Sequence, residues 1–222
     1  MIKNNLLRAS ALLTIAFLTF TVLASPLAYS LATEISLLGS AWDHDNITVY
    51  IQLQKGIDSS YEGEVKSAFN DWSNALKTKA TNPNAFNFNF LNKPESKKRP
   101  ADIYVEVRKN TGTILGSATI SSSNGKIKEV KIVLAAYNAL GLPLGREDFR
   151  TIARHEIGHG LGLGHSNDDG KEPLDLMAPT YDFVGVNKDI YPSDLNLNAL
   201  IFIYGTDGFG GINLSQIPSK YP

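Results

Sequence analysis

Residues 155–165 read His-Glu-Ile-Gly-His-Gly-Leu-Gly-Leu-Gly-His, and this stretch constrains the fold more than any other part of the chain. His155 and His159 are four positions apart, so on a helix they project from one face, one turn apart. Two imidazoles in that arrangement can bind one metal ion. Gly162 can adopt a left-handed backbone conformation and end the helix, after which the chain can turn back and supply His165 as a third ligand.

Three histidine ligands leave one position of a tetrahedral zinc ion open for water, as in catalytic rather than structural zinc sites. Glu156 follows the first ligand on the same helix and can contact that water. The alternative is a buried helix that carries three histidines by chance. However, the chain has only four histidines, and three of them fall within this one stretch. The sequence therefore predicts one catalytic Zn²⁺ ion bound by His155, His159 and His165.

A second motif, Asp-Leu-Met-Ala-Pro-Thr-Tyr, follows at residues 175–181. Together the two motifs resemble the metzincin metalloproteases, whose zinc helix is followed by a tight turn that carries a methionine. In that family the methionine lies beneath the metal ligands as an apolar floor, and the resemblance implies this role for Met177. Taken alone, Met177 would be better explained as an ordinary core residue.

The spacing of Met177, Pro179 and Tyr181, with Ser166 directly after the third histidine, resembles the matrixin branch of the metzincins. The resemblance implies that Pro179 and Tyr181 form the wall of the pocket for the substrate side chain just after the cleaved bond. It also implies a strand at the rim of the cleft, whose exposed edge pairs with an extended substrate. The residues of this strand are Gly116, Ser117, Ala118 and Thr119.

Apolar residues that alternate predict strands, and apolar residues at helical spacing predict helices. The expected strands cover residues 47–53, 86–90, 103–107, 115–120 and 127–134. The expected helices are a long one with Trp72 in its core-facing stripe, the zinc helix at about 147–161, and a last helix at 196–204. These elements and the resemblance imply an α+β, zincin-like metzincin fold. Its parts are a mixed, twisted five-stranded sheet, two long helices, the Met-turn and a C-terminal helix.

The first 32 residues are typical of an export signal. Lys3 and Arg8 precede an uncharged apolar run at residues 9–24, and small residues suited to cleavage follow. The alternative is an uncleaved membrane anchor, since a span needs about 20 apolar residues. Residues 33–205 are then expected to form the catalytic domain, and residues 206–222 a loose C-terminal tail. Either reading places the catalytic domain outside the cytoplasm, and the first makes the protein secreted.

Composition excludes several other classes of protein. The formal net charge is −1, and no basic patch indicates binding to nucleic acid. The chain has no cysteine, which excludes a disulfide framework and a thiol-based metal site. We expect a monomer. Calcium often stabilises the family that the sequence resembles, but no calcium loop is recognisable. The acidic candidates for calcium binding are Asp102, Asp168, Asp169 and Asp182.

The sequence allows two roles each for Asp175 and His44. Asp175, just before the Met-turn, is a candidate partner for the outer nitrogen of a ligand histidine, and a solvated turn residue is the alternative. His44, the fourth histidine, is expected at the surface. The alternative is that His44 or one of its neighbours Asp43 and Asp45 blocks the zinc before maturation.

The resemblance implies a zinc-dependent endopeptidase that hydrolyses internal bonds of protein or peptide substrates, with a metal-activated water and Glu156 as general base. Two alternatives remain. One is a non-catalytic, zinc-holding extracellular binding module, which would not need the intact Glu156. The other is a processing peptidase of narrow specificity. Association with a membrane is expected only if the N-terminal segment stays uncleaved.

Overall fold

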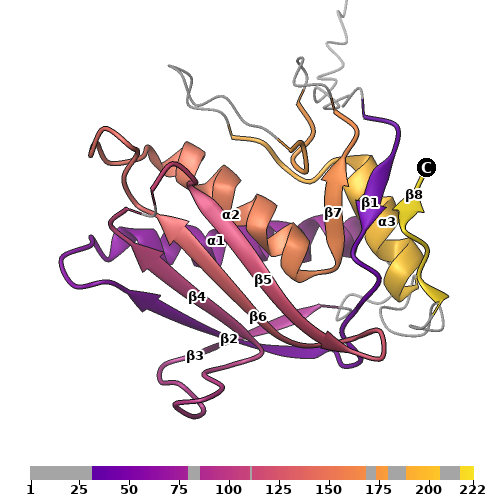
Figure 1. Ribbon diagram of the computed structural model, residues 1–222, viewed down its shortest axis with the longest axis horizontal. Coiled ribbons are helices and arrows are strands. Elements are labelled where there is room, and N and C mark those ends of the chain that lie inside the picture. Colours follow the sequence, from indigo (N-terminus) through magenta and orange to yellow (C-terminus); the bar gives the residue numbers. More distant parts are fainter. Residues whose placement is uncertain (1–31, 80–85, 111, 169–173, 180–188, 206–215) are drawn as a thin grey trace, which may run out of the picture.

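A mixed five-stranded sheet carries most of the core, as the sequence predicts (Figure 1). Its strands lie in the order β3-β2-β4-β6-β5, and only β5 runs antiparallel to its neighbour. The strands are β2 (Asn46–Leu53), β3 (Asn87–Leu91), β4 (Ile103–Arg108), β5 (Gly116–Ser123) and β6 (Lys126–Ala135). Because β5 pairs with β6 on one side only, it forms an edge of this sheet.

The computed structural model describes residues 32–79, 86–110, 112–168, 174–179, 189–205 and 216–222. Tyr181, Asp169 and Asp182 lie outside these ranges, as does the expected export segment apart from its last residue. Within the described ranges, no helix combines the length and apolar character that a membrane crossing requires.

Two long helices, α1 (Ser60–Lys79) and α2 (Arg146–Gly160), pack against each other on one face of the sheet (Figure 1). The apolar stripe of α1 buries Phe69 and Trp72 completely. The Trp72 indole also donates a 2.9 Å hydrogen bond to the Arg154 carbonyl of α2, which joins the two helices. The core role predicted for Trp72 is therefore confirmed.

A second, three-stranded antiparallel sheet was not predicted. It has the order β7-β1-β8 and consists of β1 (Ile35–Leu37), β7 (Leu163–Ser166) and β8 (Lys220–Tyr221). These strands are too short for an alternating pattern to reveal them. The expectation of a loose tail is corrected at its end, because β8 pairs with β1.

The end of α2 explains how β7 comes back beside the helix. Gly162 adopts φ +104°, and a Cβ there would lie 2.7 Å from the Ser40 carbonyl oxygen. Two side chains bind the carbonyls of the last residue of α2 and of the residue that follows it. The Trp42 indole donates to the Gly160 carbonyl at 3.0 Å, and the Tyr204 hydroxyl donates to the Leu161 carbonyl at 2.8 Å. Tyr204 is the last residue of the C-terminal helix α3 (Asp194–Tyr204).

Candidate active site

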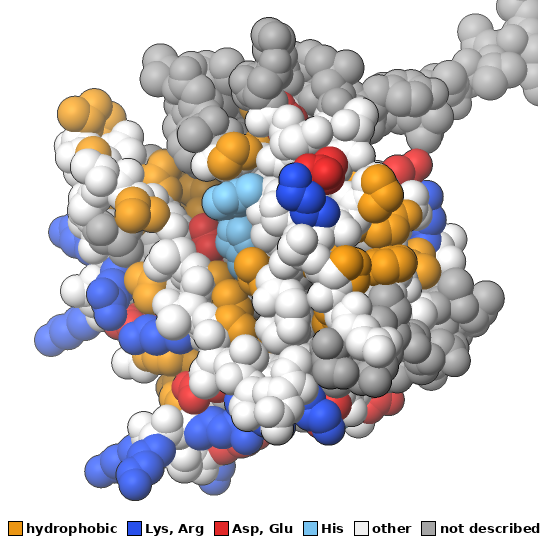
Figure 2. Space-filling view, turned by 45° about the vertical axis from the view of Figure 1, so that its right-hand side comes forward, with side chains coloured by type: hydrophobic (Ala, Val, Ile, Leu, Met, Phe, Trp, Pro, Cys, Tyr) orange, Lys and Arg blue, Asp and Glu red, His pale blue; other side chains and the backbone are white. Residues whose placement is uncertain are grey.

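Three histidines meet where α2 and β7 lie side by side. His155 and His159 come from α2 and His165 from β7, and one ring nitrogen of each lies within 4.8 Å of the others. Their ring centroids are 4.6 to 5.3 Å apart. Figure 2 shows the histidines at the surface of a hollow, with hydrophobic side chains on its rim. Among the described residues, this is the group of side chains suited to hold a metal ion.

The outer nitrogens of two of these histidines are fixed by backbone carbonyls. His155 Nδ1 lies 2.7 Å from the Leu176 carbonyl and His159 Nδ1 lies 2.8 Å from the Leu163 carbonyl. A carbonyl can only accept, so both Nδ1 atoms carry the proton and both Nε2 atoms present lone pairs. These two Nε2 atoms lie 3.0 Å apart. Two lone pairs at that distance repel each other, and a shared cation would relieve this repulsion.

Burial keeps these imidazoles in the neutral form that a metal needs. Burial and, after it, the neighbouring His159 lower the pKa of His155 to about 3. Burial also lowers the pKa of His159 and of His165. The ligand set, the fixed tautomers and the neutral rings fit a Zn²⁺ ion, which binds histidine nitrogens at about 2.0–2.1 Å.

The Glu156 carboxyl is 6 % exposed and lies beside the histidines. Burial raises its pKa to about 8, and a nearby cation would lower the pKa again by favouring the carboxylate. Gly116 of β5 leaves the space that this side chain occupies. A Cβ at position 116 would lie 2.6 Å from Glu156 Oε1 and 2.7 Å from Ile152 Cγ2.

Met177 is fully buried and lies against the zinc helix. A Cβ at Gly158 would lie 2.5 Å from Met177 Sδ and 3.1 Å from Trp72 Cζ2. Gly158, which directly precedes His159, therefore allows the methionine to approach the backbone of α2. The resemblance implies that Met177 forms an apolar floor beneath the metal ligands, and this role stays a prediction.

Both expectations for Asp175 are corrected. Asp175 is neither the hydrogen-bond partner of a ligand histidine nor a solvated turn residue. It is 2 % exposed and accepts hydrogen bonds from Ser193 Oγ at 2.5 Å, Asn196 Nδ2 at 2.9 Å and the Met177 amide at 2.8 Å. Its own amide donates to Asp168 Oδ2 at 2.6 Å. Asp175 thus fixes the Met-turn to the start of α3, while backbone carbonyls orient the histidines.

A pocket of about 320 Å³ opens beside the histidines and Glu156. Pro179 and Gly116 line it, whereas Ser117, Ala118 and Thr119 of the expected rim strand do not. Half of the other lining residues are apolar, and the rest are polar or ionisable. The full lining is Thr113, Ile114, Leu115, Gly116, Thr151, Ile152, His155, Glu156, Asp175, Leu176, Ala178 and Pro179.

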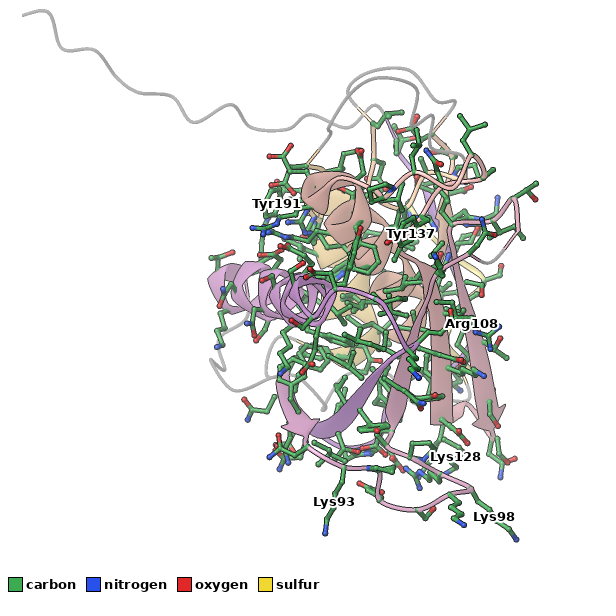
Figure 3. The ribbon with its side chains drawn as sticks, turned by 90° about the vertical axis from the view of Figure 1, so that its left-hand side faces the viewer. Lys93, Lys98, Arg108, Lys128, Tyr137 and Tyr191 are labelled. Carbon is green, nitrogen blue, oxygen red and sulfur yellow. The ribbon has the colours of Figure 1, made fainter. Side chains whose placement is uncertain are left out.

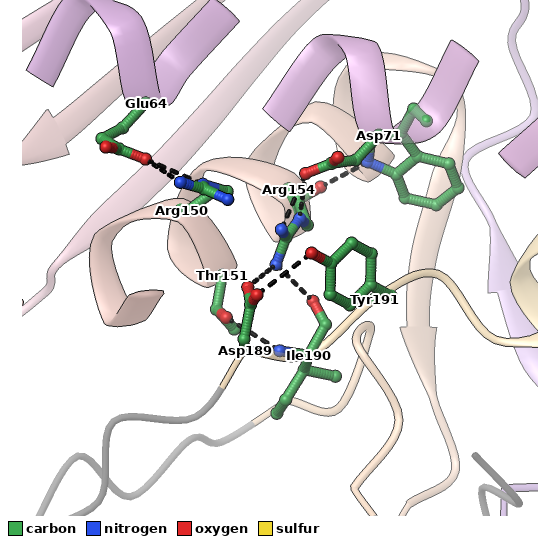
Figure 4. Close-up of polar contacts among 9 residues, drawn as sticks. Glu64, Asp71, Arg150, Thr151, Arg154, Asp189, Ile190 and Tyr191 are labelled. Carbon is green, nitrogen blue, oxygen red and sulfur yellow. Dashed lines mark hydrogen bonds and ion pairs between the residues drawn. The ribbon is translucent and has the colours of Figure 1, made fainter. Parts of the chain in front are cut away.

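Sequence reasoning missed Arg154, which directly precedes the first ligand histidine. Its side chain is fully buried and binds Asp71 of α1 at 2.7 Å, Asp189 at 2.5 Å and the Ile190 carbonyl at 2.9 Å (Figure 4). The Tyr191 ring covers the guanidinium at 3.9 Å. A charged residue within the buried face of a helix was the signal, because such a residue needs partners in the fold.

The described calcium candidates and His44 make contacts outside the group of three histidines. Asp102 accepts hydrogen bonds from the Thr48 amide and hydroxyl and pairs with Arg99, while Asp168 binds the Asp175 amide. These two aspartates use their oxygens on protein donors, so the described residues lend calcium binding no support. His44 contacts Asp43 at 3.1 Å and is partly exposed, as expected of a surface residue.

Comparison with known proteins places the chain in a family. The matrixin family model, Peptidase M10, matches residues 41–205, and the chain belongs to this family of zinc metalloendopeptidases. Matrix metalloproteinase-16 of Homo sapiens is 28% identical over 77% of this chain and 28% of its own length. Matrix metalloproteinase-18 of Xenopus laevis is 43% identical over 24% of this chain and 10% of its own length.

The chain spans less than a third of the length of the first of these curated relatives. Among solved structures, that of myroilysin is similar, with a TM-score of 0.38 and 20% identity over 59% of this chain and 54% of the other.

Proposed function

We propose that the protein is a zinc-dependent endopeptidase that hydrolyses internal bonds of protein or peptide substrates. The observation that carries the proposal is the group of His155, His159 and His165 with the buried Glu156 carboxyl beside it, at the mouth of a pocket. Membership in the matrixin family supports the same conclusion.

When bound by the three histidines, zinc supplies Lewis acidity, which lowers the pKa of a water and polarises the scissile carbonyl. Glu156 accepts the proton of the attacking water and delivers it to the leaving amine, so it acts first as general base and then as general acid. The close contact with Gly116 limits where the carboxyl can lie. No covalent link between the protein and the substrate is required.

The substrate side chain just after the cleaved bond is proposed to enter the 320 Å³ pocket. We expect an apolar side chain there, because part of the lining is made of Leu115, Ile152, Leu176, Ala178 and Pro179. The carboxylate of Asp175, which also lines the pocket, already accepts three hydrogen bonds within the protein. We also propose that Tyr181 forms part of the pocket wall, and the spacing of Met177, Pro179 and Tyr181 in the sequence supports this role. β5 is proposed to pair with the substrate backbone, and its place at the edge of the sheet supports this role.

We further propose that residues 1–32 direct export and that the domain acts outside the cytoplasm as a monomer. The basic start and the apolar run of this segment support the proposal. Finding the protein in the culture medium, with its N-terminus near residue 33, would support export with cleavage. Retention in the membrane with residues 1–32 attached would instead indicate an anchor.

The direct test compares the protein with its Glu156→Gln variant on a fluorogenic peptide library. We expect the wild type to cut peptides in a chelator-sensitive way, and the variant to lose at least about 100-fold of kcat while still binding zinc, because the amide cannot accept the proton. Glu147→Gln, an exposed change in the first turn of α2, is the matched control and should retain activity.

Full activity of Glu156→Gln would contradict its role as base. A wild-type protein that binds zinc and cuts neither library peptides nor unfolded proteins would favour the non-catalytic binding module. Cleavage of one partner protein alone would instead indicate a processing peptidase.

A further inference from the structure

The loop between β6 and α2 exposes two leucines on a short turn, residues 138–142, which we name the leucine turn. Leu140 is 84 % exposed and Leu142 is 57 % exposed. Leu144, two positions further on, is buried and anchors the loop to the core. Exposure of large aliphatic side chains to water is unfavourable, so a surface that presents several of them together is a candidate binding site.

Hydrogen bonds hold the leucine turn in one shape. The Asn138 side-chain oxygen accepts from the amides of Leu140 and Leu142, both at 3.0 Å. The Asn138 amide donates to the Leu142 carbonyl at 2.9 Å, and the Gly141 amide donates to the Asn138 carbonyl at 2.9 Å. Gly141 adopts φ +77°, which allows the tight reversal. The two leucines are therefore presented by an ordered turn, which lowers the entropy lost when a partner binds.

The leucine turn follows the end of β6, which is hydrogen-bonded to a residue that lines the pocket. The Ala135 amide donates to the Leu115 carbonyl at 2.8 Å, and Leu115 lines the pocket. Asn138 comes three residues after Ala135, which corresponds to about 10 Å of extended chain. The Asn110 amide group donates to the Asn138 carbonyl at 3.3 Å, so the segment that leads into β5 is tied to the turn.

Ile114 lines the pocket and is 63 % exposed, and it lies in the segment before β5 that Asn110 ties to the leucine turn. Figure 3 shows Tyr137, which precedes the turn, in the upper half of the molecule, while Lys93 and Lys98 lie at the opposite end. The leucine turn, which follows Tyr137 directly along the chain, therefore lies away from the end of the molecule that carries these lysines.

We propose that the leucine turn and Ile114 form an apolar extension of the cleft, which binds apolar side chains of the substrate at the third and fourth residues after the one in the pocket. This inference rests on the proposed function. An extended peptide advances about 3.3 Å per residue. The chain from Ala135, which is hydrogen-bonded to the pocket residue Leu115, to Asn138 spans at most about 10 Å, so three peptide residues can reach the start of the leucine turn.

The direction of the substrate follows from the free edge of β5. Antiparallel pairing is slightly the more stable arrangement, so a bound peptide is expected to run opposite to β5. Its C-terminal half then passes Gly116 and Ile114 in that order and heads toward the leucine turn. The apolar extension therefore binds substrate residues that follow the cleaved bond.

The test uses three fluorogenic peptides with the same residues around the cleaved bond. One carries Leu-Leu at the third and fourth positions after the residue in the pocket, one carries Ser-Ser there, and one carries Leu-Leu the same distance before the bond. For wild type, we expect kcat/KM of the first peptide to exceed that of the second by about tenfold, mostly through a lower KM.

In the double variant Leu140→Ser with Leu142→Ser, this ratio should fall to near one. Phe202→Ser, which alters an exposed aromatic residue of α3, is the matched control and should keep the tenfold ratio. Far-UV circular dichroism verifies that each variant is folded.

An unchanged ratio in the double variant, or an equal preference for leucines placed before the bond, would overturn the inference while leaving the proposed function intact. Failure of wild type to cut any of the three peptides would count against the proposed function itself, and the inference would fall with it. If light scattering shows a wild-type dimer that the double variant cannot form, the turn binds a second copy of the chain, and the inference is overturned.

Discussion

Glycines set how closely the side chains of the candidate site approach the backbone. Gly116 leaves room for the Glu156 carboxyl, and Gly158 leaves room for the Met177 sulfur. The sequence predicted that Glu156 and the three histidines come together, because helical spacing and Gly162 suffice for that. It did not predict the roles of Gly116 and Gly158, since each depends on a neighbour that is distant along the chain.

The hydrogen-bond partners of the ligand histidines could not be predicted from the sequence either. The carbonyls of Leu176 and Leu163 orient His155 and His159, and a carbonyl is present at every residue. No sequence pattern distinguishes the two that bind a ring nitrogen. Asp175 was the more visible candidate because it is charged, yet it binds Ser193, Asn196 and the Met177 amide instead.

Gly116→Ala tests whether the contact with β5 positions the general base. The added methyl group would lie 2.6 Å from Glu156 Oε1, so the carboxyl must move. We expect kcat to fall about 100-fold, as for other displacements of about 1 Å in an active site, with zinc content unchanged. Steady-state kinetics and metal analysis measure the two effects.

Ser117→Ala, at the next position of the same strand, is the control and should retain most activity. Wild-type kcat in Gly116→Ala would show that β5 does not position Glu156.

Among the helices and strands, those with long periodic patterns were predicted well. The five strands of the main sheet, α2 and α3 all lie within a few residues of the expected ranges, and α1 is the expected long helix that carries Trp72. The strands β1, β7 and β8 escaped prediction because two to four residues cannot show a period. β7 carries His165, so the third ligand was predicted from the motif and not from its strand.

The buried Arg154 joins α1, α2 and the segment at Asp189–Tyr191, which follows the Met-turn along the chain. Thr151 of α2 lines the pocket and accepts a hydrogen bond from the Ile190 amide at 3.1 Å. The ion pairs of Arg154 therefore hold this segment against the helix that carries two ligand histidines.

Arg154→Met should lower the free energy of unfolding by about 3 kcal/mol, because it leaves the carboxylates of Asp71 and Asp189 without their buried partner. Urea denaturation followed by tryptophan fluorescence measures the change. Lys66→Met removes an exposed pair with Glu62 and serves as the control, with an expected cost under about 1 kcal/mol. Equal effects in the two variants would contradict the structural role of Arg154.

Across the molecule, the cleft is assembled from parts that lie far apart in the sequence. The edge of the main sheet, the zinc helix and the Met-turn all contribute lining residues to one pocket. The motifs predicted these parts and their order. The exposed leucine turn could not be recognised from the sequence, because apolar residues between a strand and a helix are usually buried.

The central claim is that His155, His159 and His165 bind one zinc ion. The measurement that tests it most directly is the zinc content per chain after dialysis against a weak competing chelator. We predict one zinc per chain for wild type and for His44→Ala, which alters the histidine outside the group. His159→Ala should lose the metal, with affinity reduced more than about 100-fold, since removal of a ligand exceeds the cost of losing one of its supporting contacts. A wild-type chain without zinc, or a His159→Ala variant that retains it equally well, would contradict the account.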